Sequence, residues 1–226
     1  MSSDNGMCLE SEVECGEECS KIQILKPTQL LIRKVHLSFC PDFLFFAPEL
    51  RFTPKFDLNQ LLSSLNFSHD FVSSGRRAAF FGTVAYQYGH DTCHIPRDTN
   101  SNPYIAEMFT FVLSVFPDMK LNSCLINYYP NSDCTMPFHS DNERCIASHS
   151  FVVTLSLGAE RTMFFKLREN RSKNVCKGEL CSIKLAHGSI LVFSRASQSR
   201  FVHGLPKEHS PASGPRISAT FRRLVR

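Results

Sequence analysis

The feature that most constrains the fold is a series of short apolar segments in the second half of the chain. Beyond Leu121, seven segments of six to eight residues are separated by Gly, Pro, Asn or Asp, the residues that end strands and form turns. Such spacing is typical of two packed sheets, a sandwich or a jelly roll. The predicted strands are 123–129, 150–157, 161–167, 181–186, 189–194, 200–205 and 216–222, with a polar surface loop at 168–180.

Two segments before these strands have the periodicity of amphipathic helices. In residues 57–65, apolar side chains at positions 58, 61, 62 and 65 share one helical face, and Asp57 is suited to cap the first turn. Residues 103–116 open with a proline and carry an apolar stripe at positions 105, 108, 109, 112, 113 and 116. We therefore expect an α+β fold in which N-terminal helices pack on one face of the double-sheet core.

The N-terminal segment differs from the rest of the chain. Residues 1–20 carry six acidic side chains and no Lys or Arg, which predicts a disordered acidic tail. Residues 21–226 are rich in Leu, Ile, Val and Phe and suffice for one domain with a real core. No signal segment opens the chain and no apolar run reaches membrane-spanning length. We therefore expect a soluble, intracellular (nuclear or cytoplasmic) monomer without a membrane partner.

The ten cysteines are scattered and lack the density of a small disulfide-stabilised domain. Cys15 and Cys19, with Cys8 upstream, could contribute to a zinc site, but no His or Cys pair at finger spacing follows them. Reduced, mostly buried thiols are therefore the expectation.

A metal site is indicated by a histidine and an aspartate in the segment PFHSDNE. His139 and Asp141 stand at i and i+2, so in a strand their side chains point to the same side. His203, on a later predicted strand, can supply a third ligand. Two imidazoles and one carboxylate leave three positions of an octahedral ion open, the arrangement of non-haem Fe(II) oxygenases. A His-x-Asp pair by itself also arises by chance on surface loops, so the downstream residues decide between the two interpretations.

The last predicted strand alternates polar and apolar side chains, with Arg216, Ser218, Thr220 and Arg222 on one face and Ile217, Ala219 and Phe221 on the other. Two inward-facing arginines on a core strand are costly unless each meets an anion, and a dicarboxylate would supply both. The guanidinium group also pairs bidentately with a carboxylate. The alternative is a basic edge strand whose arginines face solvent.

Several motifs, taken in order, resemble the AlkB-like family of 2-oxoglutarate- and Fe(II)-dependent dioxygenases. They are His139-x-Asp141, His203 and Arg216-x5-Arg222, with Asn127-Tyr128-Tyr129 upstream and the runs TLSLG and HGSILVF between them. The resemblance covers residues 75–224. It implies a double-stranded β-helix (jelly-roll) core over 121–224 and a substrate lid over 76–95.

The resemblance also implies the cofactors and the residues that hold them. The cofactors would be Fe(II), 2-oxoglutarate as co-substrate, and O2, with His139, Asp141 and His203 as the metal ligands of the catalytic centre. In the co-substrate pocket, Arg216 with Tyr129 would bind the distal carboxylate, and Asn127 with Arg222 the end that chelates iron. Ser218 stands where many members carry Asn, so one hydrogen bond to the co-substrate would be lost or made through water.

The implied reaction oxidises 2-oxoglutarate to succinate and CO2 and hydroxylates a substrate C–H bond. When the carbon is an N-methyl group, the product breaks down to formaldehyde and a free amine. Members that repair alkylated bases flip the base into a pocket and stack it there. DNA or RNA is therefore the expected partner.

The segment RRAAFFGTVAYQYG resembles the substrate lid of those members. Tyr88, with Tyr86 beside it, is the candidate for stacking on the base, and Glu143 for contact with an exocyclic nitrogen; candidates for phosphate contacts are Arg76, Arg77 and Arg200. In the alternative interpretation, the tyrosines pack against one sheet face and Arg76–Arg77 form a solvated turn.

Two other functions fit the same residues. The same oxygenase chemistry could act on a protein side chain or a small molecule, which predicts succinate formation without strong affinity for oligonucleotides. A catalytically silent nucleic-acid-binding module could also keep the fold, but the complete set of predicted metal ligands argues against it.

Overall fold

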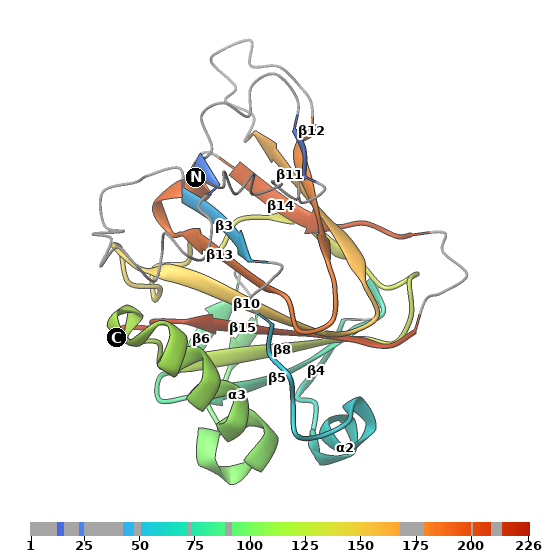
Figure 1. Ribbon diagram of the computed structural model, residues 1–226. Helices are drawn as coiled ribbons and strands as arrows, with labels where there is room; N and C mark the ends of the chain where they lie inside the picture. The colour runs from blue at the N-terminus through green and yellow to red at the C-terminus, as the bar shows by residue number, and fades with distance from the viewer. Residues whose placement is uncertain are drawn as a thin grey trace, which may run out of the picture.

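The computed structural model describes residues 13–15, 23–24, 43–47, 51–71, 74–88, 92–167, 179–199, 201–208 and 214–226 (Figure 1). Of the predicted tail, only Val13–Cys15 are described, as strand β1, so the tail stays a prediction. Of the predicted loop 168–180, residues 168–178 lie outside the described residues, as do Cys8, Cys19 and Arg200. Glu179 and Leu180 instead belong to strand β12 (Glu179–Leu185), because Glu179 pairs with Lys166 of the neighbouring strand.

The larger sheet has eight strands in the order β2-β3-β13-β10-β15-β8-β5-β4. Its pairs are antiparallel, except that β2 is parallel to β3. In this order the strands are β2 (Gln23–Ile24), β3 (Phe43–Ala47), β13 (Ile190–Ser194), β10 (Phe151–Gly158), β15 (Arg216–Arg222), β8 (Ser123–Tyr129), β5 (Arg76–Gly82) and β4 (His69–Phe71).

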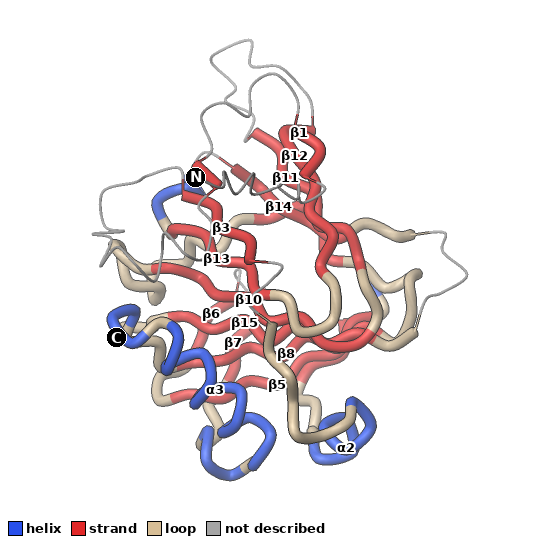
Figure 2. The backbone as a smooth tube through the Cα atoms, viewed as in Figure 1, coloured by secondary structure: helices blue, strands red, loops and turns tan. Residues whose placement is uncertain are grey.

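The smaller sheet has five strands in the order β1-β12-β11-β14-β9, and β6 pairs with β7 in a separate hairpin. Figure 2 shows the two large sheets as layers, which confirms the predicted jelly-roll core. The remaining strands are β1 (Val13–Cys15), β12 (Glu179–Leu185), β11 (Arg161–Leu167), β14 (Phe201–Leu205), β9 (Met136–His139), β6 (Tyr86–Tyr88) and β7 (Thr92–His94).

Both predicted helices are present. The helix α2 (Leu58–Ser64) begins after Asp57, whose carboxylate accepts from the backbone N–H of Gln60 at 2.8 Å while the Gln60 side chain accepts from Asp57 N. This reciprocal capping satisfies two N–H groups that the first turn leaves without partners. The helix α3 (Pro103–Val115) begins with its proline and is capped by the Asn102 side chain. Short 3-10 turns are η4 (Thr99–Ser101), η5 (Pro117–Met119) and η6 (Ala196–Ser199).

The helices cover the outer face of the larger sheet (Figure 1), as predicted. Leu61 of α2, and Ile105 and Val112 of α3, are fully buried in a cluster that includes Ile217 and Phe221 of β15. A second cluster fills the space between the two sheets and includes Tyr129, Met136, Met163, Phe165, Leu191 and Phe193. Because strand side chains alternate, the inner side of β15 is left to its polar residues. None of the described helices is long and apolar enough to cross a membrane.

Candidate metal centre

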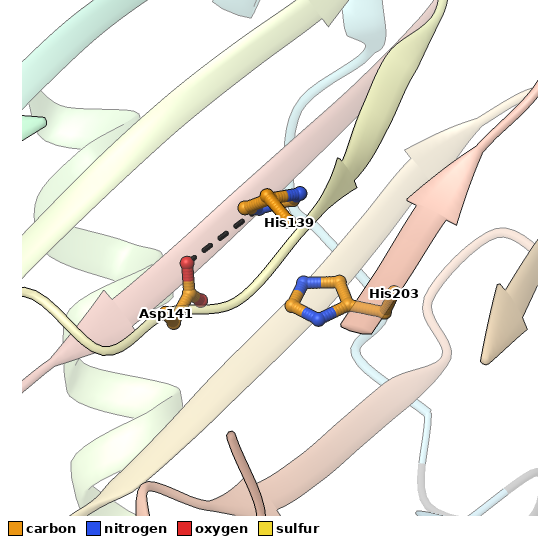
Figure 3. Close-up of side chains that lie close together, drawn as sticks. All are labelled: His139, Asp141 and His203. Carbon is orange, nitrogen blue, oxygen red and sulfur yellow. Dashed lines mark ion pairs between the residues drawn. The ribbon is translucent and has the colours of Figure 1, made fainter. Parts of the chain in front are cut away.

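Three side chains far apart in the sequence converge on one point (Figure 3). His139, Asp141 and His203 each offer one ligand atom, and these atoms lie within 4.8 Å of one another. The Nε2 atom of His139 is 3.6 Å from Oδ1 of Asp141, and the centroids of the two imidazole rings are 4.4 Å apart. Two nitrogen donors and one carboxylate oxygen at this spacing suit a divalent first-row transition metal.

A β-bulge turns His139 toward this centre. β9 pairs with β14, with His139 opposite His203 and Met136 opposite Leu205, so three steps along β9 match two steps along β14. In a regular strand, residues three apart would face opposite sides, but a bulge bends the strand and re-aims its side chains. As a result, Met136 and His139 both line the same pocket.

Asp141 reaches the centre by a different route from the predicted one. Sequence periodicity places His139 and Asp141 on one strand face, but β9 ends at His139 and Asp141 lies in irregular chain. The backbone N–H of Asp141 donates to Oε1 of Gln198 in η6 at 3.0 Å, and the Ser140 hydroxyl donates to the carbonyl of Phe201 at 3.0 Å. These anchors, and not strand alternation, direct the carboxylate inward.

The Asp141 carboxylate is buried and half satisfied. Its Oδ2 atom accepts from Nη2 of Arg222 at 2.9 Å, whereas its Oδ1 atom accepts no hydrogen bond from the described residues. Burial by itself would raise the pKa of Asp141, but Arg222, His139 and His203 together hold it well below its usual range. An ionised oxygen that is buried without a donor fits a metal ion as its missing partner.

Both histidines present a ring nitrogen to this centre. Burial, with His139 nearby, lowers the pKa of His203 to about 3, so its ring is uncharged at neutral pH. Nδ1 of His139 lies 2.9 Å from the carbonyl oxygen of Pro137. A carbonyl can only accept, so Nδ1 carries a proton, and Nε2 is the nitrogen that faces Asp141. The residues present therefore fit a bound metal.

A pocket extends from this centre along the inner face of the larger sheet. It is lined by side chains of β15, β8 and β10, by parts of the smaller sheet and by Asp141. The lining residues are Leu125, Asn127, Tyr129, Met136, His139, Asp141, Thr154, Met163, His203, Arg216, Ser218, Thr220 and Arg222. The structure thus brings all eight residues predicted for metal and co-substrate into one pocket. Thr154 and Thr220 also line it and were not predicted, although Thr220 stands in the same alternating pattern as its neighbours.

Arg216 supplies a buried positive charge at this pocket. Only 1% of it is exposed, its Nη2 donates to Oγ of Ser156 at 3.0 Å, and its guanidinium lies 5.4 Å from the centroid of the Tyr129 ring. Its Nε makes no hydrogen bond with the described residues. Burial lowers the pKa of Arg216 to about 10, which still leaves it charged at neutral pH. A carboxylate would satisfy both the charge and the unused donors.

Arg222 is engaged with the protein itself. Besides its bond to Asp141, it stacks over the Tyr86 ring, with 5.1 Å between guanidinium carbon and ring centroid. Burial would lower the pKa of Arg222, but the charge of Asp141 raises it above its usual range. Arg222 therefore acts directly on the carboxylate of Asp141, in addition to lining the pocket.

The candidate substrate residues fall into different environments. Tyr86 is fully buried, stacked on His94 at 5.9 Å and lying under Arg222, so it does not offer a free face to a base. For Tyr88 the structure describes the backbone alone, at the end of β6. Glu143 is partly buried, and burial together with the charge of Asp141 raises its pKa.

The two described candidates for phosphate contacts, Arg76 and Arg77, differ in their exposure to solvent. Arg76 is 3% exposed and donates to Oδ1 of Asn127, a position that does not suit a contact with phosphate in solvent. Arg77 is exposed and lies 4.7 Å from the ring centroid of Phe67. Since Ala79 and Phe81 of β5 pack under the helices, strand alternation puts Arg77 on the sheet face away from the metal centre.

Residues 66–222 match the family described as the 2OG-Fe(II) oxygenase superfamily. The chain is 27% identical over 139 residues to the DNA oxidative demethylase ALKBH2 of Arabidopsis thaliana, covering 54% of this chain and 44% of the relative. It is 33% identical over 152 residues to the human alpha-ketoglutarate-dependent dioxygenase alkB homolog 3, covering 65% and 51%. The chain thus spans about half the length of the curated relatives it matches.

Proposed function

Because the chain belongs to the 2OG-Fe(II) oxygenase superfamily, we propose that it is a dioxygenase that removes alkyl groups from the nitrogen atoms of nucleic-acid bases. The observation that carries the proposal is the convergence of His139, Asp141 and His203 at one end of a pocket that also holds the buried charge of Arg216. The family supplies the identity of the metal, Fe(II), and of the co-substrate, 2-oxoglutarate.

In this proposal the three ligands hold Fe(II) through Nε2 of His139, a ring nitrogen of His203 and Oδ1 of Asp141. The bound metal supplies the reduction of O2, coupled to oxidation of 2-oxoglutarate to succinate and CO2, with the second oxygen atom inserted into a substrate C–H bond. Arg222 keeps Asp141 ionised, and burial keeps His203 neutral, so both ligands are ready for a metal at neutral pH.

The co-substrate is held by the polar side of the pocket. In this proposal Arg216, beside Tyr129, receives the distal carboxylate, and Asn127 with Arg222 helps to hold the end that chelates the metal. Ser218 is short, and its hydroxyl lies 3.5 Å from that of Thr220. We infer that these two hydroxyls take the place of the Asn that many AlkB-like proteins carry at the position of Ser218.

The substrate class comes from the relatives, of which ALKBH2 is named as a DNA oxidative demethylase. Glu143, whose pKa is raised by burial and by the charge of Asp141, is proposed to meet an exocyclic base nitrogen. Tyr88 is proposed to stack on the base, and the enzyme to act as a monomer. Hydroxylation of an N-methyl group gives a hydroxymethyl amine, which breaks down to formaldehyde and the free base nitrogen.

The test is incubation with Fe(II), 2-oxoglutarate, O2 and oligonucleotides that carry 1-methyladenine or 3-methylcytosine, followed by mass spectrometry. We expect each lesion to lose the mass of one CH2 group and one succinate to form for each lesion removed. His139→Ala should abolish both products, whereas the matched variant His149→Ala, at an exposed histidine, should retain them.

Two other outcomes would replace the proposal. Succinate formed without any change in the oligonucleotides would point to a protein or small-molecule substrate. Failure of the wild-type protein to bind Mn(II) or Fe(II) and to consume 2-oxoglutarate would instead indicate a nucleic-acid-binding module without catalysis.

A further inference from the structure

Arg76 and Asn127 form a buried pair at the wall of the pocket. Each is 3% exposed, and Nη1 of Arg76 donates a hydrogen bond to Oδ1 of Asn127. Arg76 begins β5 and Asn127 lies within β8, and the two strands pair with Ala78 opposite Asn127. Arg76, Ala78 and Phe80 alternate along β5, and the last two pack on the inner side of the sheet with Leu125, which lines the pocket.

The chemistry of the guanidinium group dictates the polarity of this pair. Arginine has N–H donors and no acceptor, so Asn127 must turn its amide oxygen toward Arg76. Its NH2 group, which bonds to no described residue, is then left for the pocket that Asn127 lines. An asparagine without such a neighbour can flip its amide and offer either group, and Arg76 removes that freedom.

We infer that Arg76 is a positioning residue, which makes Asn127 a hydrogen-bond donor to an oxygen of 2-oxoglutarate, and that it does not contact nucleic-acid phosphate. This inference rests on the proposed function. At neutral pH every oxygen of 2-oxoglutarate is an acceptor, so a ligand of this class is bound by an NH2 group and repelled by an amide oxygen.

The charges around the pocket agree with this assignment. Burial raises the pKa of Tyr129, and the guanidinium groups of Arg76 and Arg216 both act against that rise. Arg76 therefore lies within electrostatic reach of the phenol that Arg216 also faces. A co-substrate with two carboxylates complements this excess of buried positive charge, whereas a phosphate on a nucleic-acid strand has no access to a side chain that is 3% exposed.

The first experiment compares Arg76→Met with the matched variant Arg77→Met. Binding of 2-oxoglutarate is measured by calorimetry with Mn(II) in place of Fe(II), and binding of a methylated oligonucleotide is measured as a function of salt. We expect Arg76→Met to weaken 2-oxoglutarate binding by about tenfold, the worth of a hydrogen bond to a charged group, and Arg77→Met to leave it unchanged. Arg76→Lys should keep more of the affinity, since an ammonium group can donate to the same amide oxygen.

The measurement of oligonucleotide binding distinguishes a positioning role of Arg76 from a phosphate contact. A positioning role leaves the salt dependence of oligonucleotide binding as in the wild type. A lost phosphate contact would instead reduce the slope of log K against log salt by about one, with unchanged affinity for 2-oxoglutarate. That second pattern would overturn the inference.

A second pair of variants covers the case in which Arg76→Met fails to fold. Asn127→Asp keeps a partner for Arg76 and retains the fold, but presents an acceptor to the co-substrate. It should therefore bind 2-oxoglutarate more weakly than Asn127→Ala, which only removes the donor. Equal or tighter binding by Asn127→Asp would refute the inference. If the wild-type protein itself does not bind 2-oxoglutarate with Mn(II), the proposed function fails instead.

Discussion

At the scale of single residues, Arg222 is a buried charge that depends on two partners, Asp141 and Tyr86. Its guanidinium lies between the carboxylate of Asp141, at 2.9 Å, and the ring of Tyr86, in a place where only 4% of Arg222 is exposed. A buried charge pair is weak evidence for stability, but removal of one partner leaves the other charge buried without compensation. Loss of Arg222 would therefore leave the negative charge of Asp141 buried without this partner.

We predict that Arg222→Met lowers the free energy of unfolding of the metal-free protein by about 3–5 kcal/mol, measured by urea denaturation. Mn(II) should recover more stability in the variant than in the wild type, because the dication replaces the missing positive charge beside Asp141. The control is Arg223→Met, which removes an exposed arginine one position further and should change stability little. Equal losses in both variants would contradict the role given to the ion pair.

The types and the order of the residues were enough to predict which side chains form the candidate metal centre, but not how the fold brings them together. The pattern of His139, Asp141 and His203 was visible because chemistry restricts which side chains can bind a metal. The bulge in β9 and the anchoring of Asp141 by Gln198 were not visible, since they depend on strands distant in sequence. The burial of Arg76 was not predicted either, because a polar group in a short segment gives no sign of a buried partner.

At the scale of elements, the turn between β10 and β11 depends on one glycine. Gly158 has φ +89°, and a Cβ atom built on it would lie 2.2 Å from the carbonyl oxygen of Pro215. Other residues adopt this backbone conformation at a cost, and here the contact is with backbone, which cannot move aside as a side chain can. The turn holds the end of β10 against the first residue of β15, Arg216.

We predict that Gly158→Ala destabilises the protein by more than about 1 kcal/mol, through strain and the contact with Pro215. It should also weaken 2-oxoglutarate binding, because the contact displaces the chain just before Arg216. Gly214→Ala is the control, since its Cβ would meet only the Ala159 side chain, at 3.9 Å. Thermal unfolding and calorimetry on both variants check this; indistinguishable variants would contradict it.

Seven strands and two helices could be predicted because their signals are local. The cap at Asp57, the proline that opens α3 and the alternation in residues 216–222 each act within a few positions, and the structure reproduces them. The strands β3, β4, β5 and β9 were not among the seven predicted. They are short or lie in mixed segments, and only pairing with their neighbours defines them.

At the scale of the whole molecule, the residues proposed to bind the metal and the co-substrate come from both sheets. His139 and His203 belong to the smaller sheet, and Asn127 and Arg216 to the larger one. A ligand set that bridges the two layers binds the folded chain and not the unfolded one. Binding must then stabilise the whole domain by mass action.

We expect Mn(II) and 2-oxoglutarate together, each at about one hundred times its dissociation constant, to stabilise the fold by about 2.7 kcal/mol per ligand. The measurement is the unfolding temperature by calorimetry, and a chelator should reverse the metal-dependent part. His203→Ala should lose the rise caused by Mn(II). An increase of the same size in that variant would show that the ion binds elsewhere.

Strand β15 has a polar face toward the pocket and an apolar face toward the helices, and this limits which mutations the chain can accept. Substitutions change one face at a time, but the gain or loss of a single codon within 216–222 would exchange the faces of every residue beyond it. Arginine side chains would then enter the hydrophobic core beneath the helices, and Phe221 or Ile217 would enter the pocket. We therefore expect β15 to tolerate point substitutions better than the insertion or deletion of one residue.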